Sequence, residues 1–123
     1  MSKEEELGLI RKAFLGYESH GYLTFVIEFT FGITQQIFRN YVVGVPDDKM
    51  DIHPKYLGMK AIMKILDAVG VNNWNDLVGK ECWVRRDKFG VIEEIEAPMY
   101  RVHNGAFNIK ELIKEIESND KKN

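Results

Sequence analysis

The sequence predicts an α+β fold in which two helices pack on one antiparallel sheet. Three observations lead to this prediction. Residues 22–31 alternate between apolar and polar side chains, residues 57–69 place apolar side chains at helical spacing, and glycine or proline stands near the ends of most of these segments. The predicted order is β-β-β-α-β-β-α: a three-stranded meander, a helix, a β-hairpin and a final helix.

The first half of the chain predicts the meander. A strand over residues 9–17 leads into the polar turn 18–21, and a second strand covers 22–31. Gly32 permits the turn into a third strand over 33–43. The odd-numbered residues of the second strand form an apolar face that we expect to be buried: Leu23, Phe25, Ile27 and Phe29.

The middle of the chain predicts a loop and then a helix. Prolines and aspartates exclude regular structure over residues 44–56. The helix covers 57–69, and Gly70 is placed to end it. Asn72 or Asn73 can cap a short turn that follows.

The last third of the chain predicts a hairpin and a helix. Strands over 81–86 and 91–96 turn at residues 87–90. An irregular stretch over 99–107 follows. The last helix begins at Asn108, with a glutamate three residues later as in a capping box.

Length and composition indicate one domain over residues 1–123, with solvated ends at about 1–7 and 119–123. The net charge of −2 argues against a general electrostatic DNA coat. The single cysteine, Cys82, lies in a strand-like run and predicts a buried, inert thiol. The acidic start is unlike a secretory signal, and no apolar run reaches the ~18 residues of a membrane span, so we expect a cytoplasmic protein.

Catalytic signals are weak. The histidines His20, His53 and His103 lack ligand-like spacing, and the chain contains no nucleophile motif. Glu93, Glu94 and Glu96 can supply paired carboxylates for acid–base chemistry, but a solvated edge strand blunted by charge explains them better. We therefore predict a protein that is not an enzyme and uses no cofactor or metal.

Side chains suited to binding a ligand are more frequent than catalytic ones. A nucleotide-like ligand needs charge or amide donors for its phosphates, flat side chains for its base, and amides for its riboses. Such groups occur at the end of the second strand, in the third strand, at the end of the strand over 81–86 and in the stretch 99–107. The candidate ligand-binding residues are Phe31, Arg39, Tyr41, Arg86, Tyr100, Arg101, His103, Asn104 and Phe107.

Two segments resemble a known family. Residues 13–25 read AFLGYESHGYLTF, and residues 70–80 read GVxxWxDLxGK. The chain resembles, over residues 9–117, the first type of phage Thoeris anti-defence sponges. That resemblance implies a protein that captures, without cleaving it, a cyclic ADP-ribose isomer made by TIR-domain immune enzymes. It also implies a homo-oligomer with the ligand near subunit contacts. The chain departs from the family at residues 33–40, where a glycine-rich stretch is expected, so no ligand contact is carried over from relatives.

Two other functions fit parts of the sequence. The second hairpin carries two more positive charges than negative ones over residues 80–88, which suits single-stranded nucleic acid on a curved sheet. Glu93, Glu94 or His103 can instead serve as the general base of a messenger-cleaving enzyme.

Overall fold

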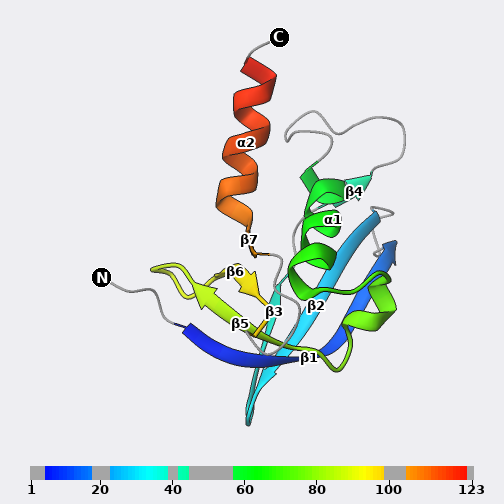
Figure 1. Cartoon of the computed structure of the whole chain (residues 1–123), viewed down its shortest axis with the longest axis vertical. Helices are drawn as coiled ribbons and strands as arrows, with labels where there is room; N and C mark the ends of the chain where they lie inside the picture. The colour runs from blue at the N-terminus through cyan, green and yellow to red at the C-terminus, as the bar shows by residue number, and fades with distance from the viewer. Residues whose placement is uncertain (1–4, 18–22, 39–41, 45–56, 99–104, 122–123) are drawn as a thin grey trace.

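The first strand organises the sheet. In the computed structural model, which describes residues 5–17, 23–38, 42–44, 57–98 and 105–121, β1 (Glu5–Tyr17) pairs with two neighbours. Its first half pairs antiparallel with β5 (Glu81–Arg86), and its second half pairs antiparallel with β2 (Leu23–Phe31). The register shifts between Ile10 and Lys12, and a bulge of this kind bends a strand. Figure 1 shows the bent β1 passing beneath both neighbours.

The sheet is antiparallel throughout and follows the order β3-β2-β1-β5-β6-β7, with β4 also pairing with β2. The remaining strands are short: β3 (Thr34–Phe38), β4 (Val42–Gly44), β6 (Ile92–Glu96) and β7 (Ala106–Asn108). The α+β class is confirmed, whereas the predicted strand order is wrong. Within the third predicted strand the structure describes β3 and β4, and β7 overlaps the stretch expected to be irregular.

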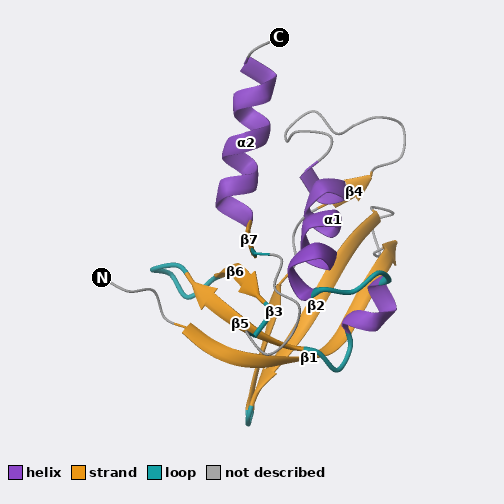
Figure 2. Ribbon diagram, viewed as in Figure 1, coloured by secondary structure: helices purple, strands orange, loops and turns teal. Residues whose placement is uncertain are grey.

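Helix α1 (Leu57–Val69) has the predicted bounds, and α2 (Ile109–Lys121) starts one residue after its predicted cap. Gly70 adopts a φ of 86° and donates its N–H to the Leu66 carbonyl at 2.8 Å, which ends α1. At α2, the Asn108 side chain accepts the Glu111 N–H at 3.0 Å. A 3₁₀ turn, η2 (Trp74–Leu77), lies between α1 and β5. Figure 2 shows both α-helices on one side of the sheet.

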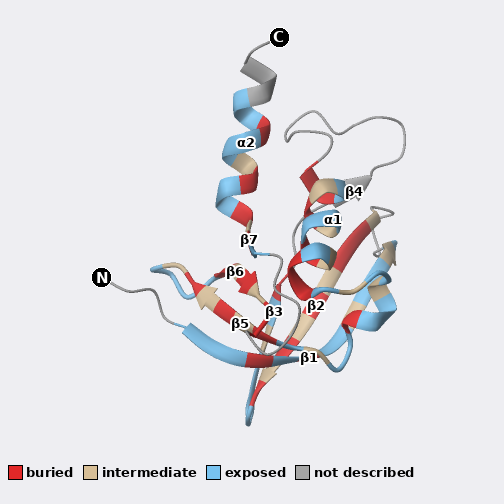
Figure 3. Ribbon diagram, viewed as in Figure 1, coloured by how far each residue is buried: buried red, intermediate tan, exposed pale blue. Residues whose placement is uncertain are grey.

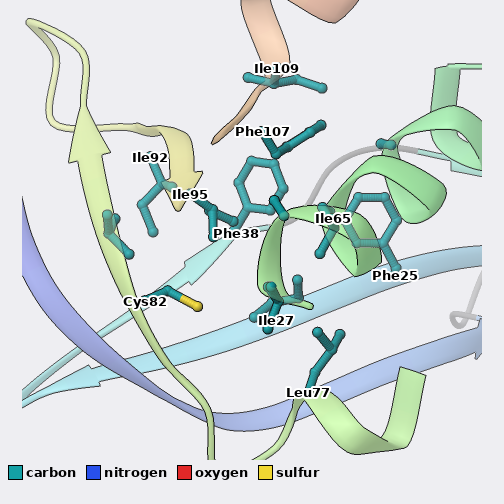
Figure 4. Close-up of a cluster of buried hydrophobic side chains, with 14 of the residues drawn as sticks. Phe25, Ile27, Phe38, Ile65, Leu77, Cys82, Ile92, Ile95, Phe107 and Ile109 are labelled. Atoms are coloured by element: carbon teal, nitrogen blue, oxygen red, sulfur yellow. The ribbon is translucent and has the colours of Figure 1, made fainter. Parts of the chain in front are cut away.

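The core lies between that side of the sheet and the helices. Figure 3 shows buried residues concentrated on the faces where α1 and the strands meet. The alternation predicted for β2 is confirmed at Phe25, Ile27 and Phe29, each fully buried. Figure 4 shows Cys82 among the buried apolar side chains, as predicted for an inert thiol. On the other face of β2, which carries the more polar side chains, Thr24 is buried too.

Strand β1 begins four residues earlier than predicted. Residues 5–7 belong to β1, although the sequence suggested a solvated end through residue 7. Glu5 pairs with Arg85 and Glu6 with Val84 in the β1–β5 register, so strand pairing holds these acidic residues in place. Of the loop predicted over 44–56, Gly44 belongs to β4, and residues 45–56 lie outside the described residues.

Candidate functional site

The structure describes three of the predicted ligand-binding residues: Phe31, Arg86 and Phe107. The others lie outside the described residues: Arg39, Tyr41, Tyr100, Arg101, His103 and Asn104. His20 and His53 also lie outside them. The described residues therefore test whether the predicted groups on β2, β5 and β7 come together.

Phe31 and Arg86 form one side-chain pair. They stand at the last positions of β2 and β5, and the centre of the Arg86 guanidinium lies 4.7 Å from the centroid of the Phe31 ring. Both residues are buried, with 9% of Phe31 and 7% of Arg86 exposed. A cation over an aromatic face is attracted by the ring quadrupole, more strongly when water is excluded. The pair is thus a rigid cationic group at one end of the sheet.

Gln36 and Glu6 complete this group. The Arg86 Nε–H donates to Gln36 Oε1 at 2.6 Å, and Nη2 donates to Glu6 Oε1 at 3.1 Å. Gln36 in turn donates from Nε2 to the Gly90 carbonyl at 2.8 Å, which joins β3 to the β5–β6 turn. We call Phe31, Arg86, Gln36 and Glu6 the arginine cluster. A planar guanidinium with its orientation fixed in this way is suited to recognise a carboxylate or a phosphate.

Gly8 of β1 leaves room for the Phe31 ring of the arginine cluster. A Cβ placed on Gly8 would lie 2.5 Å from Cε1 of Phe31, well inside the ordinary contact distance. The Phe31 ring therefore occupies the space next to Gly8 of β1. Sequence reasoning missed Gly8, Gln36 and Glu6. The signal available for Gln36 was its strand parity, because Gln36 and Phe38 alternate with the outward-facing residues of β3.

The opposite face of the sheet carries a second arginine. Arg85 Nε lies 2.6 Å from Glu5 Oε2 and Nη2 lies 2.8 Å from Glu96 Oε1, and Nη1 contacts Glu94. Partial burial lowers the pKa of Arg85, but the hydrogen bonds that its guanidinium donates to Glu96, Glu5 and Glu94 outweigh it and raise that pKa above its ordinary value. Arg85 and Arg86 thus lie on opposite faces of the sheet, as neighbouring residues of a strand do. Glu94 and Glu96 share a face and bind a guanidinium there.

The explanation of the acidic residues as a solvated edge strand is wrong. Strand β6 lies between β5 and β7, and Asn108 of β7 donates to Glu94 Oε1 at 2.9 Å. Glu93 faces the other way with 2% of its side chain exposed, and its Oε1 lies 3.0 Å from Lys110 Nζ. This burial was not predictable from a run of charges, because β7 has only three residues.

Lys110 also joins α2 to the second hairpin. Its Nζ lies 3.1 Å from Asp87 Oδ2, and its pKa is raised first by Glu93 and then by Asp87. The other Asp87 oxygen accepts the N–H groups of Phe89 and Val91 at 2.9 and 3.0 Å. These bonds, the Val91 N–H above all, and the Lys110 ammonium lower the pKa of Asp87. Asp87 therefore holds the turn as a carboxylate.

Phe107 lies in the core. It is 2% exposed, and its ring stands edge-on to Phe38 with centroids 6.0 Å apart. Figure 4 shows it between Phe38 and Ile109. Its neighbourhood also includes a groove of about 150 Å³ lined by residues of α1, β7 and α2. Among the lining residues, Glu111 and Glu115 outnumber Lys64, so this groove is poorly suited to a phosphate. We leave Phe107 out of the proposed site.

Comparisons with known proteins add no family. No protein-family model, curated protein or solved structure matches the chain. Within the described ranges, no group of three or more His, Cys, Asp or Glu side chains is arranged to hold a metal ion. No helix in the described part of the chain is long and apolar enough to cross a membrane.

Proposed function

We propose that this protein is a phage anti-immune sponge that binds a cyclic ADP-ribose-type messenger made by TIR-domain enzymes. In this proposal it sequesters the messenger in the cytoplasm of the infected bacterium and does not cleave it. The resemblance to Thoeris anti-defence sponges supplies the ligand class. The observation that carries the proposal is the contact between Phe31 and Arg86. Each was named from the sequence as a candidate for binding a nucleotide-like ligand, and the two residues are distant in the sequence.

The arginine cluster suits one part of that ligand. A guanidinium donates parallel N–H bonds to phosphate oxygens, and a pyrophosphate offers several such oxygens. Arg86 is held on two sides, by Phe31 and Gln36, before any ligand arrives. Binding at a preorganised group costs less ordering entropy, which a tight sponge requires. The cluster is therefore our candidate for the pyrophosphate position.

The other predicted residues would complete the site for the base and riboses: Arg39, Tyr41, Tyr100, Arg101, His103 and Asn104. The described residues at the ends of their segments support this grouping. Phe38 directly precedes Arg39, Phe107 follows Asn104 by three positions, and the two rings are in contact. Phe38 also lies two residues after Gln36 on β3, the strand that reaches the arginine cluster.

We further propose that the sponge is a homo-oligomer whose pocket is closed by a second copy. The end of β1 supports this, because it exposes large apolar side chains: Phe14 is 47% exposed, Leu15 41% and Tyr17 72%. Leu15 and Tyr17 share one face of β1 and Phe14 lies on the other, so exposed apolar side chains occur on both faces of this strand end, and such exposed apolar groups can mark an interaction surface. Met59 and Met63 are also exposed, which removes them from the core and leaves them available to a subunit contact.

The test is capture followed by release. The purified protein is mixed with the product of an active TIR enzyme and filtered by size, and the filtrate is assayed for activation of the downstream effector. Heating the retained protein should return the activity. Loss of signal without recovery would indicate an enzyme, and no loss of signal would reject the sponge. Arg86→Met should abolish capture, whereas Arg85→Met changes an arginine on the opposite face and should retain it.

A single-stranded nucleic acid is the second candidate ligand. One observation favours it: Lys88 Nζ lies 5.2 Å from the centroid of Phe89, which is 78% exposed at the β5–β6 turn. An exposed aromatic beside a cation can stack on a base and contact a phosphate. The carboxylates bound to Arg85 and Arg86 oppose this function. Binding that falls steeply between low and physiological salt would support it.

A further inference from the structure

Two consecutive arginines each hold one of two consecutive glutamates. Arg85 binds Glu5 at 2.6 Å, and Arg86 binds Glu6 at 3.1 Å. The faces differ because neighbouring residues of a strand point to opposite sides of the sheet. Figure 1 shows the start of β1 running beside β5, where these contacts form. The chain thus contains two ion pairs of the same chemistry in two different surroundings.

The surroundings of Arg85 are those of a structural tie. Its guanidinium contacts three carboxylates, from Glu5, Glu94 and Glu96, which lie on the strands either side of it. Removing Glu5 would leave two anions in contact with this arginine. An added anion would meet repulsion from the remaining carboxylates.

The surroundings of Arg86 differ in both polarity and access. The guanidinium lies over the Phe31 ring and donates to the neutral amide of Gln36. Only 9% of its side chain is exposed, whereas 46% of the Glu6 side chain is exposed. Glu6 therefore lies on the solvent side of this contact. An ion pair with one exposed partner contributes little stability, since water competes for the carboxylate.

We infer that the Glu6 carboxylate occupies a phosphate position, and that a phosphate group of the ligand binds Arg86 by displacing it. The displaced side chain needs only a rotation into solvent, because its backbone stays paired with Val84 of β5. A phosphate brings more charge and more acceptor oxygens to the guanidinium than a carboxylate does. In the ligand-free protein, Glu6 contacts the buried cation at 3.1 Å and competes there with weak anions. The identity of the phosphate ligand rests on the proposed function, whereas the exchange at Arg86 does not.

The experiment compares Glu6→Gln with Glu5→Gln. Binding of inorganic pyrophosphate is measured by isothermal titration calorimetry at low salt, with thermal unfolding as the folding control. We expect Glu6→Gln to tighten pyrophosphate binding by about tenfold, a typical size for coupling between two ligands. Glu5→Gln should bind like the wild type. The double variant Glu6→Gln, Arg86→Lys should lose the gain, because an ammonium cannot reproduce the guanidinium's paired donors.

Each outcome decides the inference. Equal pyrophosphate affinity in Glu6→Gln and the wild type would overturn it, as would the same gain in Glu5→Gln or no binding to any variant. Capture of the TIR product separates this result from the proposed function. If Glu6→Gln binds pyrophosphate more tightly but no variant captures the product, the phosphate position stands and the sponge is rejected. If the wild type captures the product and Glu6→Gln changes neither ligand's affinity, the sponge stands and the exchange is rejected.

Discussion

Gly8→Ala tests whether the packing beneath the arginine cluster is rigid. The new Cβ would lie 2.5 Å from Cε1 of Phe31 and 3.1 Å from Cδ1 and Cζ. Ordinary carbon contacts are about 3.5–4.0 Å, so the ring must move by about 1 Å. Phe31 is 9% exposed, stacks on Phe29 with centroids 6.1 Å apart, and carries the Arg86 guanidinium on its face. A shift of the ring therefore disturbs buried neighbours.

The magnitude follows from two opposing effects. Overpacking a buried site costs about 1–3 kcal/mol. Replacing glycine by alanine in a strand returns about 0.5–1 kcal/mol, because glycine loses more conformational freedom on folding. The net expectation is a loss of about 1–2 kcal/mol in the free energy of unfolding. For a domain of 123 residues, this corresponds to a decrease of about 4–10 °C in Tm.

Urea denaturation at equilibrium measures the effect, with Gly16→Ala as the matched control. Gly16 lies on the same strand, and its added Cβ would lie 2.9 Å from Cζ of Phe14. Phe14 is 47% exposed, so that ring can rotate into solvent, and we expect no loss of stability and a gain of up to about 1 kcal/mol. If Gly8→Ala were as stable as the wild type, or lost no more stability than Gly16→Ala, the rigid packing of Phe31 would be refuted.

Three further predictions address the core, the proposed interface and the hairpin. Phe107→Ala should lower the free energy of unfolding by about 3–5 kcal/mol in urea titrations, because its ring is buried; lost ligand capture at unchanged stability would return it to the binding site. Phe14→Glu should reduce the mass measured by light scattering to that of one chain, while the fully exposed Ile33→Glu leaves it unchanged; equal masses would remove β1 from the interface. In Asp87→Asn, the free energy of unfolding should decrease less than in the wild type as the pH is lowered. The pKa of Asp87 is lowered on folding, so its contribution is present above about pH 4 and is lost as the pH falls through the lowered pKa; parallel stability curves for variant and wild type would contradict this.

Local patterns predicted most of the elements. The alternation of β2 identified its buried face, and the spacing of apolar residues gave the bounds of α1. The same period of two accounts for the positions of Arg85 and Arg86 on opposite faces of the sheet. These successes share a cause, since strand and helix periods are properties of the backbone that any short segment displays.

The failures involve contacts between distant segments. Strand β7 has three residues, too few for a period to appear, yet it turns β6 from an edge strand into an inner one. Glu5 and Glu6 belong to an acidic run typical of a solvated end, but pairing with β5 orders them. The contact between Gln36 and Arg86 joins residues 50 positions apart, and nothing local to either residue specifies the other.

The arginine cluster shows why a candidate site is harder to predict than a fold. Chemistry alone selected Phe31 and Arg86, because aromatic rings and guanidinium groups suit a nucleotide. It could not select Glu6, whose charge repels the proposed ligand, although Glu6 contacts Arg86 and, by our inference, competes with an anion for it. Nor could it select Gly8, which has no side chain and matters through the space it leaves to Phe31. Neither Glu6 nor Gly8 has a side chain that would bind a phosphate or a base. Only the packing of β1 against β2 and β5 therefore identifies these two residues.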